Sequence, residues 1–450
     1  MNNIHNVSGF KFDSSRLLLF RDTVPTDILC RVIELYDRDN YMIPVDMKYD
    51  SNKMEMNTVA LNSAGICLSY NCNLRCQYCG YSSEENNETL LQIKDIEVFI
   101  RDILRRRTIR KVLTEKDDPL EIEFTGGGEP TYNWELFRDS ILFIKSICER
   151  NAVPLRIRLT TNGMLSNEQI DFIAANINYV MISYDGLSEV QNRNRISVYE
   201  KNSSDRVENT IRRFVFHNLP ITIRSTIWQS DFDKMGDMYN HICKLVNYSN
   251  NVAWSIYPVL FEGRAINRIH KQGEMEYERF FTNCLELMTK NDCEIRDRRP
   301  RIDFSFFNSA SYPFFCGAHR ATKPWLLPDR TIVTCIESKD DKTEIGKIVD
   351  EKVQYFAKYR DNLLDIAQRK YDECVGCIAY GTCKGGCPIW HLRSDETIKE
   401  PLECILQKKY WSYLIKALAV GDYSMGWNLE KINHPEVREY ECYKVIRGMR

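Results

Sequence analysis

Three cysteines lie close together early in the chain, at Cys72, Cys76 and Cys79. Their spacing, C-x3-C-x2-C, puts three thiolates on one short loop, where they can bind three irons of a [4Fe-4S] cluster. The fourth iron then has no protein ligand and can bind a small molecule, so the spacing predicts chemistry at the cluster. The alternative is a structural zinc site, which would need a fourth ligand from elsewhere in the chain.

A second group of residues that could bind a ligand is the run Thr125-Gly-Gly-Gly-Glu-Pro130. Glycines have no Cβ, so their backbone can approach a ligand closely. The carboxylate of Glu129 can accept hydrogen bonds from an ammonium group. Taken alone, the three glycines are more typical of a plain turn from strand to helix.

Alternating strands and helices must position these residues. Short apolar runs predict six strands, at 65–68, 121–125, 155–160, 180–184, 221–227 and 253–259. Helical spacing of apolar residues follows at 91–104 and 134–148. Ser166 and Gln169 form a capping box that predicts the start of another helix.

This alternation predicts an α/β fold with parallel strands, a partial (β/α)6 TIM-type barrel. Ligands of such folds bind at the carboxyl ends of the strands. The three cysteines follow the first predicted strand and the glycines follow the second, so both groups should meet at that end.

Composition excludes several classes of function. The 450 residues carry a formal net charge of -2, which gives no electrostatic basis for binding nucleic acid or an anionic membrane. No apolar run approaches the roughly 20 residues that span a bilayer, and residues 1–20 lack the pattern of a signal peptide. We expect a cytoplasmic protein whose 17 cysteines are metal ligands or buried apolar residues rather than disulfides.

The cysteine loop with aromatic Tyr78, together with Gly127-Gly128-Glu129-Pro130, resembles the radical S-adenosylmethionine (SAM) superfamily. The resemblance implies that SAM binds the open iron and is cleaved reductively to methionine and a 5'-deoxyadenosyl radical. It places Gly127, Gly128 and Glu129 at the methionine amino group and Tyr78 near the adenine. It also assigns three residues to the ribose or the methionine carboxylate: Asn162, Ser183 and Arg195.

A narrower branch is indicated by Ser183-Tyr-Asp-Gly186 followed by Arg195, which resembles the family's Ser-x-Asp-Gly-Pro motif. Here Leu187, Gln191 and Asn192 replace the proline, histidine and aspartate of that pattern. The role of this loop in the present chain is therefore open.

Seven later cysteines resemble the SPASM domain, a cysteine-rich module with little regular structure that holds two auxiliary [4Fe-4S] clusters. The resemblance implies three clusters in total. It assigns one auxiliary cluster to Cys374, Cys377, Cys383 and Cys404, and the other to Cys316, Cys335 and Cys387.

The second auxiliary cluster is one ligand short. Between Cys316 and Cys335 there is no other cysteine, so we expect an open or non-cysteine position, with His319, Cys293 and Cys284 as possible donors. Arg330 stands where the family usually has glycine. A purely structural role for both auxiliary clusters is the alternative.

These patterns predict five segments: an N-terminal extension at 1–64, the radical SAM core at 65–265, linker helices at 266–315, the SPASM domain at 316–405 and a helical tail at 406–450.

Three functions compete. The first is a maturase of ribosomally made peptides (RiPPs) that forms a crosslink or thioether, which Val333–Glu337 and 374–388 resemble. The second is formylglycine-type oxidation of a protein cysteine or serine, as in anaerobic sulfatase maturases. There an aspartate base follows the second SPASM cysteine, whereas this chain has Ile336 and then Glu337. The third is an iron-sulfur electron carrier, which would need no Gly127-Gly128-Glu129 pocket.

The expected partners are a peptide substrate, with or without a leader peptide, and an electron donor such as flavodoxin or ferredoxin. Glu337 is the candidate for a catalytic base. Asp329 and Asp340 lie in the same loop, where acidic residues are usually only solvated.

Overall fold

The computed structural model describes residues 62–81, 91–114, 117–199, 202–259, 323–337 and 343–356, together with short stretches elsewhere. Those stretches include strands β1 (Ile4–Val7), β2 (Phe10–Asp13) and β3 (Leu18–Arg21), which form a small antiparallel sheet. Apart from residue 408, the predicted tail at 406–450 lies outside the described residues. No helix in the described part of the chain is long and apolar enough to cross a bilayer.

A parallel sheet forms the centre of the molecule, and all six predicted strands are present within two residues of their expected bounds. Each is hydrogen-bonded in parallel to its neighbours, and a seventh short strand extends the series, in the order β12-β11-β10-β8-β7-β6-β4. The strands are β4 (Ser63–Ile66), β6 (Leu120–Phe124), β7 (Leu155–Thr161), β8 (Tyr179–Ser183), β10 (Ile221–Ile227), β11 (Val252–Pro258) and β12 (Arg301–Asp303).

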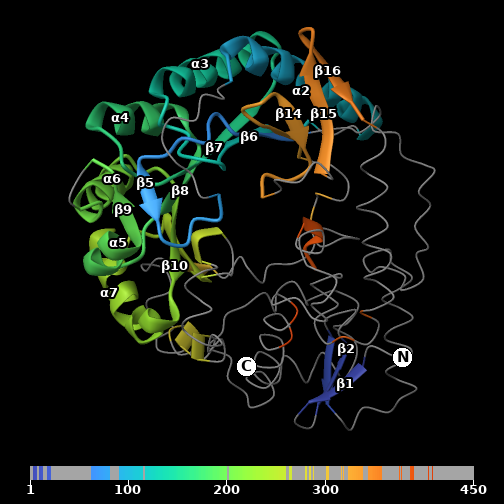
Figure 1. The fold of residues 1–450 in the computed structure, drawn as a ribbon. Coiled ribbons are helices and arrows are strands. Elements are labelled where there is room, and N and C mark those ends of the chain that lie inside the picture. The colour runs from blue at the N-terminus through green and yellow to red at the C-terminus, as the bar shows by residue number, and fades with distance from the viewer. Residues whose placement is uncertain are drawn as a thin grey trace.

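Helices cover the outer side of this sheet in an arc (Figure 1). Asn133 caps α3, and the predicted capping box of Ser166 and Gln169 opens α4. The fold class is therefore confirmed as a partial α/β barrel. The helices are α2 (Ile93–Thr114), α3 (Trp134–Arg150), α4 (Asn167–Asn176), α5 (Ser188–Asn194), α6 (Ser204–Phe216) and α7 (Met235–Leu245), with short 3-10 turns η3 (Gln229–Lys234) and η4 (Gly263–Ala265).

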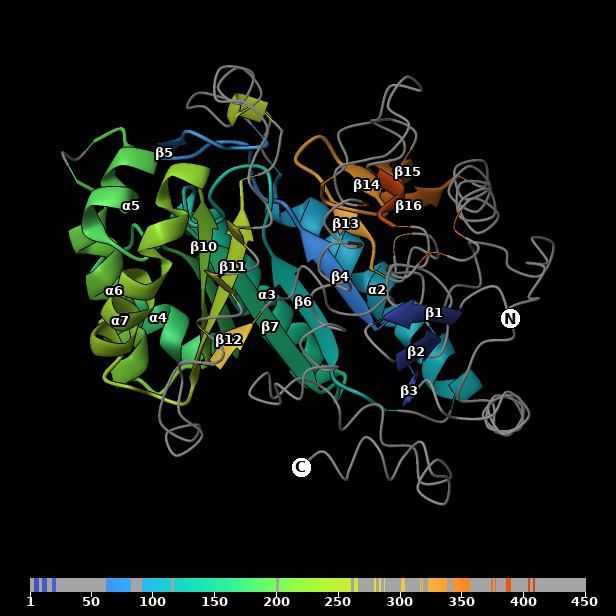
Figure 2. The same ribbon diagram turned by 90° about the horizontal axis from the view of Figure 1, so that it is seen from below.

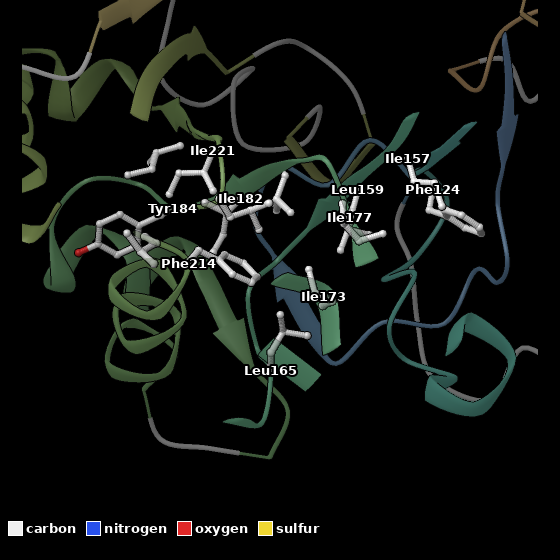
Figure 3. Packing of buried hydrophobic residues seen from close by; sticks show 14 of the residues in the cluster. Phe124, Ile157, Leu159, Leu165, Ile173, Ile177, Ile182, Tyr184, Phe214 and Ile221 are labelled. Atoms are coloured by element: carbon white, nitrogen blue, oxygen red, sulfur yellow. The ribbon is translucent and has the colours of Figure 1, made fainter. Parts of the chain in front are cut away.

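The hydrophobic core lies between strands and helices. In β7, Ile157 and Leu159 are buried, while Arg156 and Arg158, which alternate with them, retain exposure. Figure 3 shows Ile157 and Leu159 in one cluster of buried hydrophobic residues with Phe124 of β6 and Ile173 of α4. Because side chains alternate along a strand, one face of the sheet packs on the helices and the other carries polar residues. The inside of the barrel is thus left available for polar ligands.

The sheet does not end at β4. β13 (Trp325–Leu326) pairs in parallel with β4, and β14 (Thr331–Val333), β15 (Glu344–Val349) and β16 (Lys352–Tyr355) continue it as antiparallel hairpins. Figure 2 shows these strands beside β4. A Cβ on Gly65 would lie 2.0 Å from the Trp325 ring, so glycine permits this pairing. The region that carries Cys335 is therefore fixed directly to the barrel.

Arg330, where the family has glycine, occupies the turn between β13 and β14. Its φ is +70°, a left-handed conformation that favours glycine. Its Nε lies 3.1 Å from Oδ1 of buried Asp95, near the start of α2. The ion pair offsets part of the backbone strain and attaches this turn to α2.

Glu208 of α6 joins three elements around the end of β8. Its carboxylate accepts hydrogen bonds from the Tyr184 hydroxyl at 2.6 Å and from Arg212 at 2.8 Å, and it lies 3.0 Å from His241 Nε2. Burial alone would raise the pKa of Glu208, but the bonds from His241 and Tyr184 lower it to about 2.

We expect this low pKa to make folding sensitive to acid. The ordinary pKa is 4.5, so Glu208 stabilises the fold above that pH and the stabilisation is lost as pH falls from 4.5 towards 2. Glu208→Gln should therefore lower the free energy of unfolding by on the order of 1 kcal/mol at pH 6 and by less at pH 3. Urea unfolding at both values measures this, and an equal loss at the two would contradict it.

Candidate active site

The loop that holds the three predicted cluster cysteines is anchored by a small sheet. β5 (Leu74–Cys76) pairs antiparallel with β9 (Arg195–Ser197), so that Cys76 lies opposite Arg195. The backbone N–H of Gln77 also donates to the Asn194 carbonyl at 2.8 Å. The loop is therefore attached to the segment after β8, more than 100 residues later in the chain.

The cysteine thiols have a shared, poorly solvated environment. Burial, followed by the charges of Cys76 and Glu129, raises the pKa of Cys72 to about 12. Burial raises the pKa of Cys76 to about 11, although Arg195 acts in the opposite direction. Among the described residues, no three His, Cys, Asp or Glu side chains converge closely enough to hold a metal ion. A cationic iron cluster would suit Cys72 and Cys76, because metal binding replaces the protons that burial otherwise retains on these two thiols.

Gly127 and Gly128 bring the end of β6 against the start of the cysteine loop. A Cβ on Gly128 would lie 1.9 Å from the Asn71 carbonyl oxygen, and one on Gly127 would lie 2.6 Å from Cys67 Sγ. The Gly128 and Glu129 N–H groups donate to the carbonyls of Ser69 and Asn71 at 2.9 and 2.8 Å. The glycines thus allow close contact with the chain's own residues 69–71, which the sequence did not indicate.

Glu129 lies between the ends of β6 and β7 and is 3% exposed. Its Oε1 accepts from the Thr131 and Thr161 hydroxyls, both at 2.7 Å, and its Oε2 accepts from the Asn162 N–H at 2.7 Å. Burial raises the pKa of Glu129, and these bonds limit the rise. Oε2 accepts one of these hydrogen bonds, and a carboxylate oxygen can accept two. Glu129 can therefore accept a further hydrogen bond from a cationic group.

Asn162 connects β7 to the cysteine loop. Its Nδ2 donates to Asn73 Oδ1 at 2.7 Å and lies 3.8 Å from Cys72 Sγ. Ser183 ends β8 and is half-buried. The structure therefore brings Asn162 to the cysteine loop and places Ser183 at the same end of the sheet.

Asp185 is a fully buried carboxylate that joins two of the predicted SAM-binding residues. It accepts hydrogen bonds from the Tyr78 hydroxyl at 2.5 Å, from Arg195 Nε at 3.1 Å, from Asn194 Nδ2 at 3.3 Å and from the Thr226 N–H at 3.2 Å. The Arg195 guanidinium also lies 5.2 Å from the centre of the Tyr78 ring. Asp185 thus fixes the cysteine loop and Arg195 together, a role that the Ser-x-Asp-Gly motif did not reveal.

Trp228, which directly follows β10, was not predicted from the sequence. Its ring centre is 6.4 Å from that of Tyr78, and its side chain is 6% exposed. Among the described residues its Nε1 is a buried donor with no hydrogen-bond partner. A buried N–H without an acceptor is costly, so this atom beside the cysteine loop fits a bound ligand that carries acceptors.

The residues that depart from the family's loop pattern have structural roles. Gln191 accepts from the Asp185 N–H at 3.0 Å, and Asn192 Oδ1 accepts from the N–H groups of Ser203 and Ser204, both at 2.9 Å. They hold α5 to the start of α6. This loop therefore supports Asp185.

Six of the seven predicted auxiliary-cluster cysteines are described, all half-buried: Cys316, Cys335, Cys374, Cys377, Cys387 and Cys404. Cys383 lies outside the described residues, as do His319 and Cys293. Cys284 is buried in the hydrophobic core, and burial raises its pKa well above 9.0, so it behaves as an apolar residue. Cys335 follows β14, and the Tyr81 hydroxyl donates to the carbonyl of the next residue, Ile336, at 2.9 Å. The two cysteine-bearing regions are thus directly connected.

Comparison with known protein families identifies the core of this arrangement. Residues 66–241, from β4 to α7, match the model of the radical SAM superfamily. The chain carries a radical SAM domain. Radical SAM enzymes bind a [4Fe-4S] cluster and SAM, and the three cysteines, Glu129 and the unpaired Trp228 N–H suit those cofactors.

This radical SAM enzyme is related to anaerobic sulfatase-maturating enzymes. It is 22% identical over 365 residues to the cysteine-type enzyme of Clostridium perfringens (strain ATCC 13124), covering 78% of this chain and 95% of that protein. It is 29% identical over 334 residues to that of Clostridium novyi (strain NT), covering 71% and 85%.

Solved structures show the same fold. The structure of tagged anSMEcpe with bound AdoMet has a TM-score of 0.60 and 17% identity, covering 81% of this chain and 99% of that one. That of native anSMEcpe with bound AdoMet and Cp18Cys peptide has a TM-score of 0.58, covering 79% and 97%.

We expect Asp185→Asn to destabilise the protein strongly, because it leaves Arg195 buried without a counter-charge. The loss should be about 3 kcal/mol in the free energy of unfolding, measured by urea denaturation. Asp231→Asn is the matched control. Asp231 is 1% exposed and pairs with Arg193, whose side chain is 44% exposed, so water can solvate the arginine and the loss should be smaller. Equal losses of unfolding free energy in the two variants would contradict the role of Asp185 as the counter-charge of buried Arg195.

Proposed function

We propose that this radical SAM enzyme modifies a peptide by forming a crosslink or thioether. The observation that supports this proposal is the residue after Cys335. In sulfatase maturases an aspartate base follows the second SPASM cysteine. This chain has Ile336 at that position, and its side chain cannot accept a proton. It is 9% exposed, and a Cβ on Gly126 would lie 2.1 Å from its Cγ1, so it packs against the active-site end of β6. Glu337, the weak candidate base, is exposed one residue further on.

In this proposal the described residues bind and orient the cofactors. Cys72, Cys76 and Cys79 hold the cluster, Glu129 accepts from the SAM ammonium group, and Arg195, positioned by Asp185, binds the methionine carboxylate or the ribose. When bound, the cluster and SAM supply a 5'-deoxyadenosyl radical that abstracts a hydrogen atom from the peptide.

Bond formation removes two hydrogens from the peptide in total. One leaves as the abstracted hydrogen atom, and the other leaves as a proton and an electron. Cys335 and the other SPASM cysteines would hold an auxiliary iron-sulfur cluster, which would supply an acceptor for this electron. The hydrogen bond from Tyr81 to the Ile336 carbonyl connects Cys335 to the cysteine loop. An external flavodoxin or ferredoxin would supply the electron for a cluster held by Cys72, Cys76 and Cys79.

Formylglycine-type oxidation is the second candidate, because the chain is similar to sulfatase-maturating enzymes along most of their length. Mass spectrometry distinguishes the two reactions. The reconstituted enzyme is incubated with SAM, reductant and either a sulfatase-type cysteine peptide or short cysteine peptides encoded beside its gene. We expect loss of two hydrogens with sulfur retained. Loss of two hydrogens together with replacement of sulfur by oxygen in the sulfatase peptide, which converts the cysteine to the aldehyde, would establish the second reaction instead.

Ile336→Asp tests whether the residue after Cys335 decides which reaction occurs. If position 336 decides the outcome, the variant should gain aldehyde formation on the sulfatase-type peptide, while it still forms 5'-deoxyadenosine. No change in product would mean that Ile336 does not determine the reaction.

A further inference from the structure

The unpaired indole of Trp228 requires an acceptor. Its Nε1 has no hydrogen-bond partner among the described residues, although the side chain is almost completely buried against Val259 and Ala265. Trp254 provides the contrast. It is also buried, but its Nε1 donates to the Ser225 hydroxyl at 2.8 Å. Buried N–H groups in folded proteins are paired as a rule, so Trp228 is expected to donate to something that binds.

Trp228 belongs to the packed unit that holds the cysteine loop. Its ring lies beside Tyr78, whose hydroxyl is fixed by Asp185. The η4 turn that packs on Trp228 also reaches this loop, since the Arg264 N–H donates to the Cys79 carbonyl at 3.2 Å. The rings of Tyr78 and Trp228, tilted by 51° to each other, thus lie next to one another near the end of β10.

We propose that the Trp228 indole N–H donates a hydrogen bond to the adenosine part of SAM. Adenosine offers ring nitrogens and ribose oxygens as acceptors, and its flat base can pack against an aromatic ring such as that of Tyr78 or Trp228. The charged methionine part is matched by Glu129 and Arg195, which extend from different strand ends. This inference rests on the proposed placement of SAM at this end of the sheet, and it does not depend on which peptide is modified.

Two variants separate the N–H from the ring. Trp228→Phe keeps an aromatic surface and removes the donor. Incorporation of 3-benzothienylalanine at position 228 keeps the bicyclic shape and replaces the N–H by sulfur. Trp254→Phe is the matched control, because it removes a buried indole whose donor is already paired within the protein.

The measurement is the dissociation constant of SAM for the anaerobically reconstituted enzyme without peptide, by equilibrium dialysis. The 5'-deoxyadenosine and methionine constants are measured separately. Both Trp228 variants should weaken SAM and 5'-deoxyadenosine binding about tenfold and leave methionine binding unchanged. Trp254→Phe should lower the melting temperature more than the benzothienyl variant and leave SAM binding unchanged.

Unchanged SAM binding in the benzothienyl variant would overturn the proposal and assign the N–H to a bound water. Equal weakening in Trp254→Phe would also overturn it, since the effect would then come from general loosening of the barrel. A change in methionine binding alone would assign Trp228 to the other end of SAM and reject the adenosine contact. Because no peptide is present, failure of the proposed peptide modification cannot be confused with any of these results.

Discussion

Replacing Cys76 by alanine is expected to abolish release of 5'-deoxyadenosine from SAM. Cys76 lies on β5 opposite Arg195, so its loss removes one predicted iron ligand from a loop that is otherwise held in place. A [4Fe-4S] cluster bound by two thiolates is not retained stably. Under reductant and SAM, chromatography should detect 5'-deoxyadenosine from the parent enzyme and none above background from the variant.

Cys148→Ala is the matched control. Cys148 is a buried thiol of α3 in the hydrophobic core, so its removal should cost about 1 kcal/mol of stability and leave SAM cleavage intact. Three clusters predict about twelve irons and twelve sulfides per chain, of which Cys76→Ala should lose about four. Persistent cleavage in the variant would refute the ligand assignment. Zinc with little sulfide in the parent enzyme would refute the clusters, and no cleavage by an iron-loaded parent would favour the electron carrier.

Replacing Gly128 by alanine is expected to be almost as damaging, without removing any ligand. The new Cβ would lie 1.9 Å from the Asn71 carbonyl oxygen, which is backbone and cannot rotate away. Two hydrogen bonds, from Gly128 to Ser69 and from Glu129 to Asn71, hold the segments together. Residues 69–71 must therefore move, and Cys72 follows directly. We expect a loss of about 3 kcal/mol in the free energy of unfolding and at least a hundredfold lower SAM cleavage.

Gly236→Ala controls for glycine replacement itself. Gly236 lies in the first turn of α7, and no atom lies within 4 Å of the position of an added Cβ. This change should alter stability by less than about 1 kcal/mol, towards greater stability, and preserve cleavage. Urea unfolding, iron content and 5'-deoxyadenosine formation are measured for both variants. Full iron content and activity in Gly128→Ala would show that the contact with residues 69–71 is not needed.

The barrel was predictable because its signals are local. Each of the six strands is a run of apolar residues, because its side chains are buried between the sheet and the helices. The Ser166 capping box involves residues only three positions apart. The cysteine loop and the glycine run could be recognised for a similar reason, since each set lies on a continuous segment. Their role in SAM binding stays a prediction.

The features that sequence reasoning missed depend on distant partners. β5 and β9 have three residues each, too few to show a period, and they form because they pair with each other. Asp185 accepts hydrogen bonds from Tyr78, which lies 107 positions away, and from Thr226, which lies 41 positions away. Trp228 gives no signal in the sequence, because an unpaired donor can be recognised only when its surroundings are known. The segment boundaries at 265, 315 and 405 stay predictions.

The pairing of β4 with β13 has a consequence for synthesis on the ribosome. Gly65 emerges long before its partner Trp325, with about 260 residues between them. At roughly 5 to 20 residues per second, the outer edge of β4 waits on the order of 10 to 50 seconds for β13. During that time a nascent barrel exposes an unpaired strand edge, which is a template for association with other chains. We therefore expect slower translation between these strands to reduce the soluble yield, and chaperones that shield nascent chains to restore it.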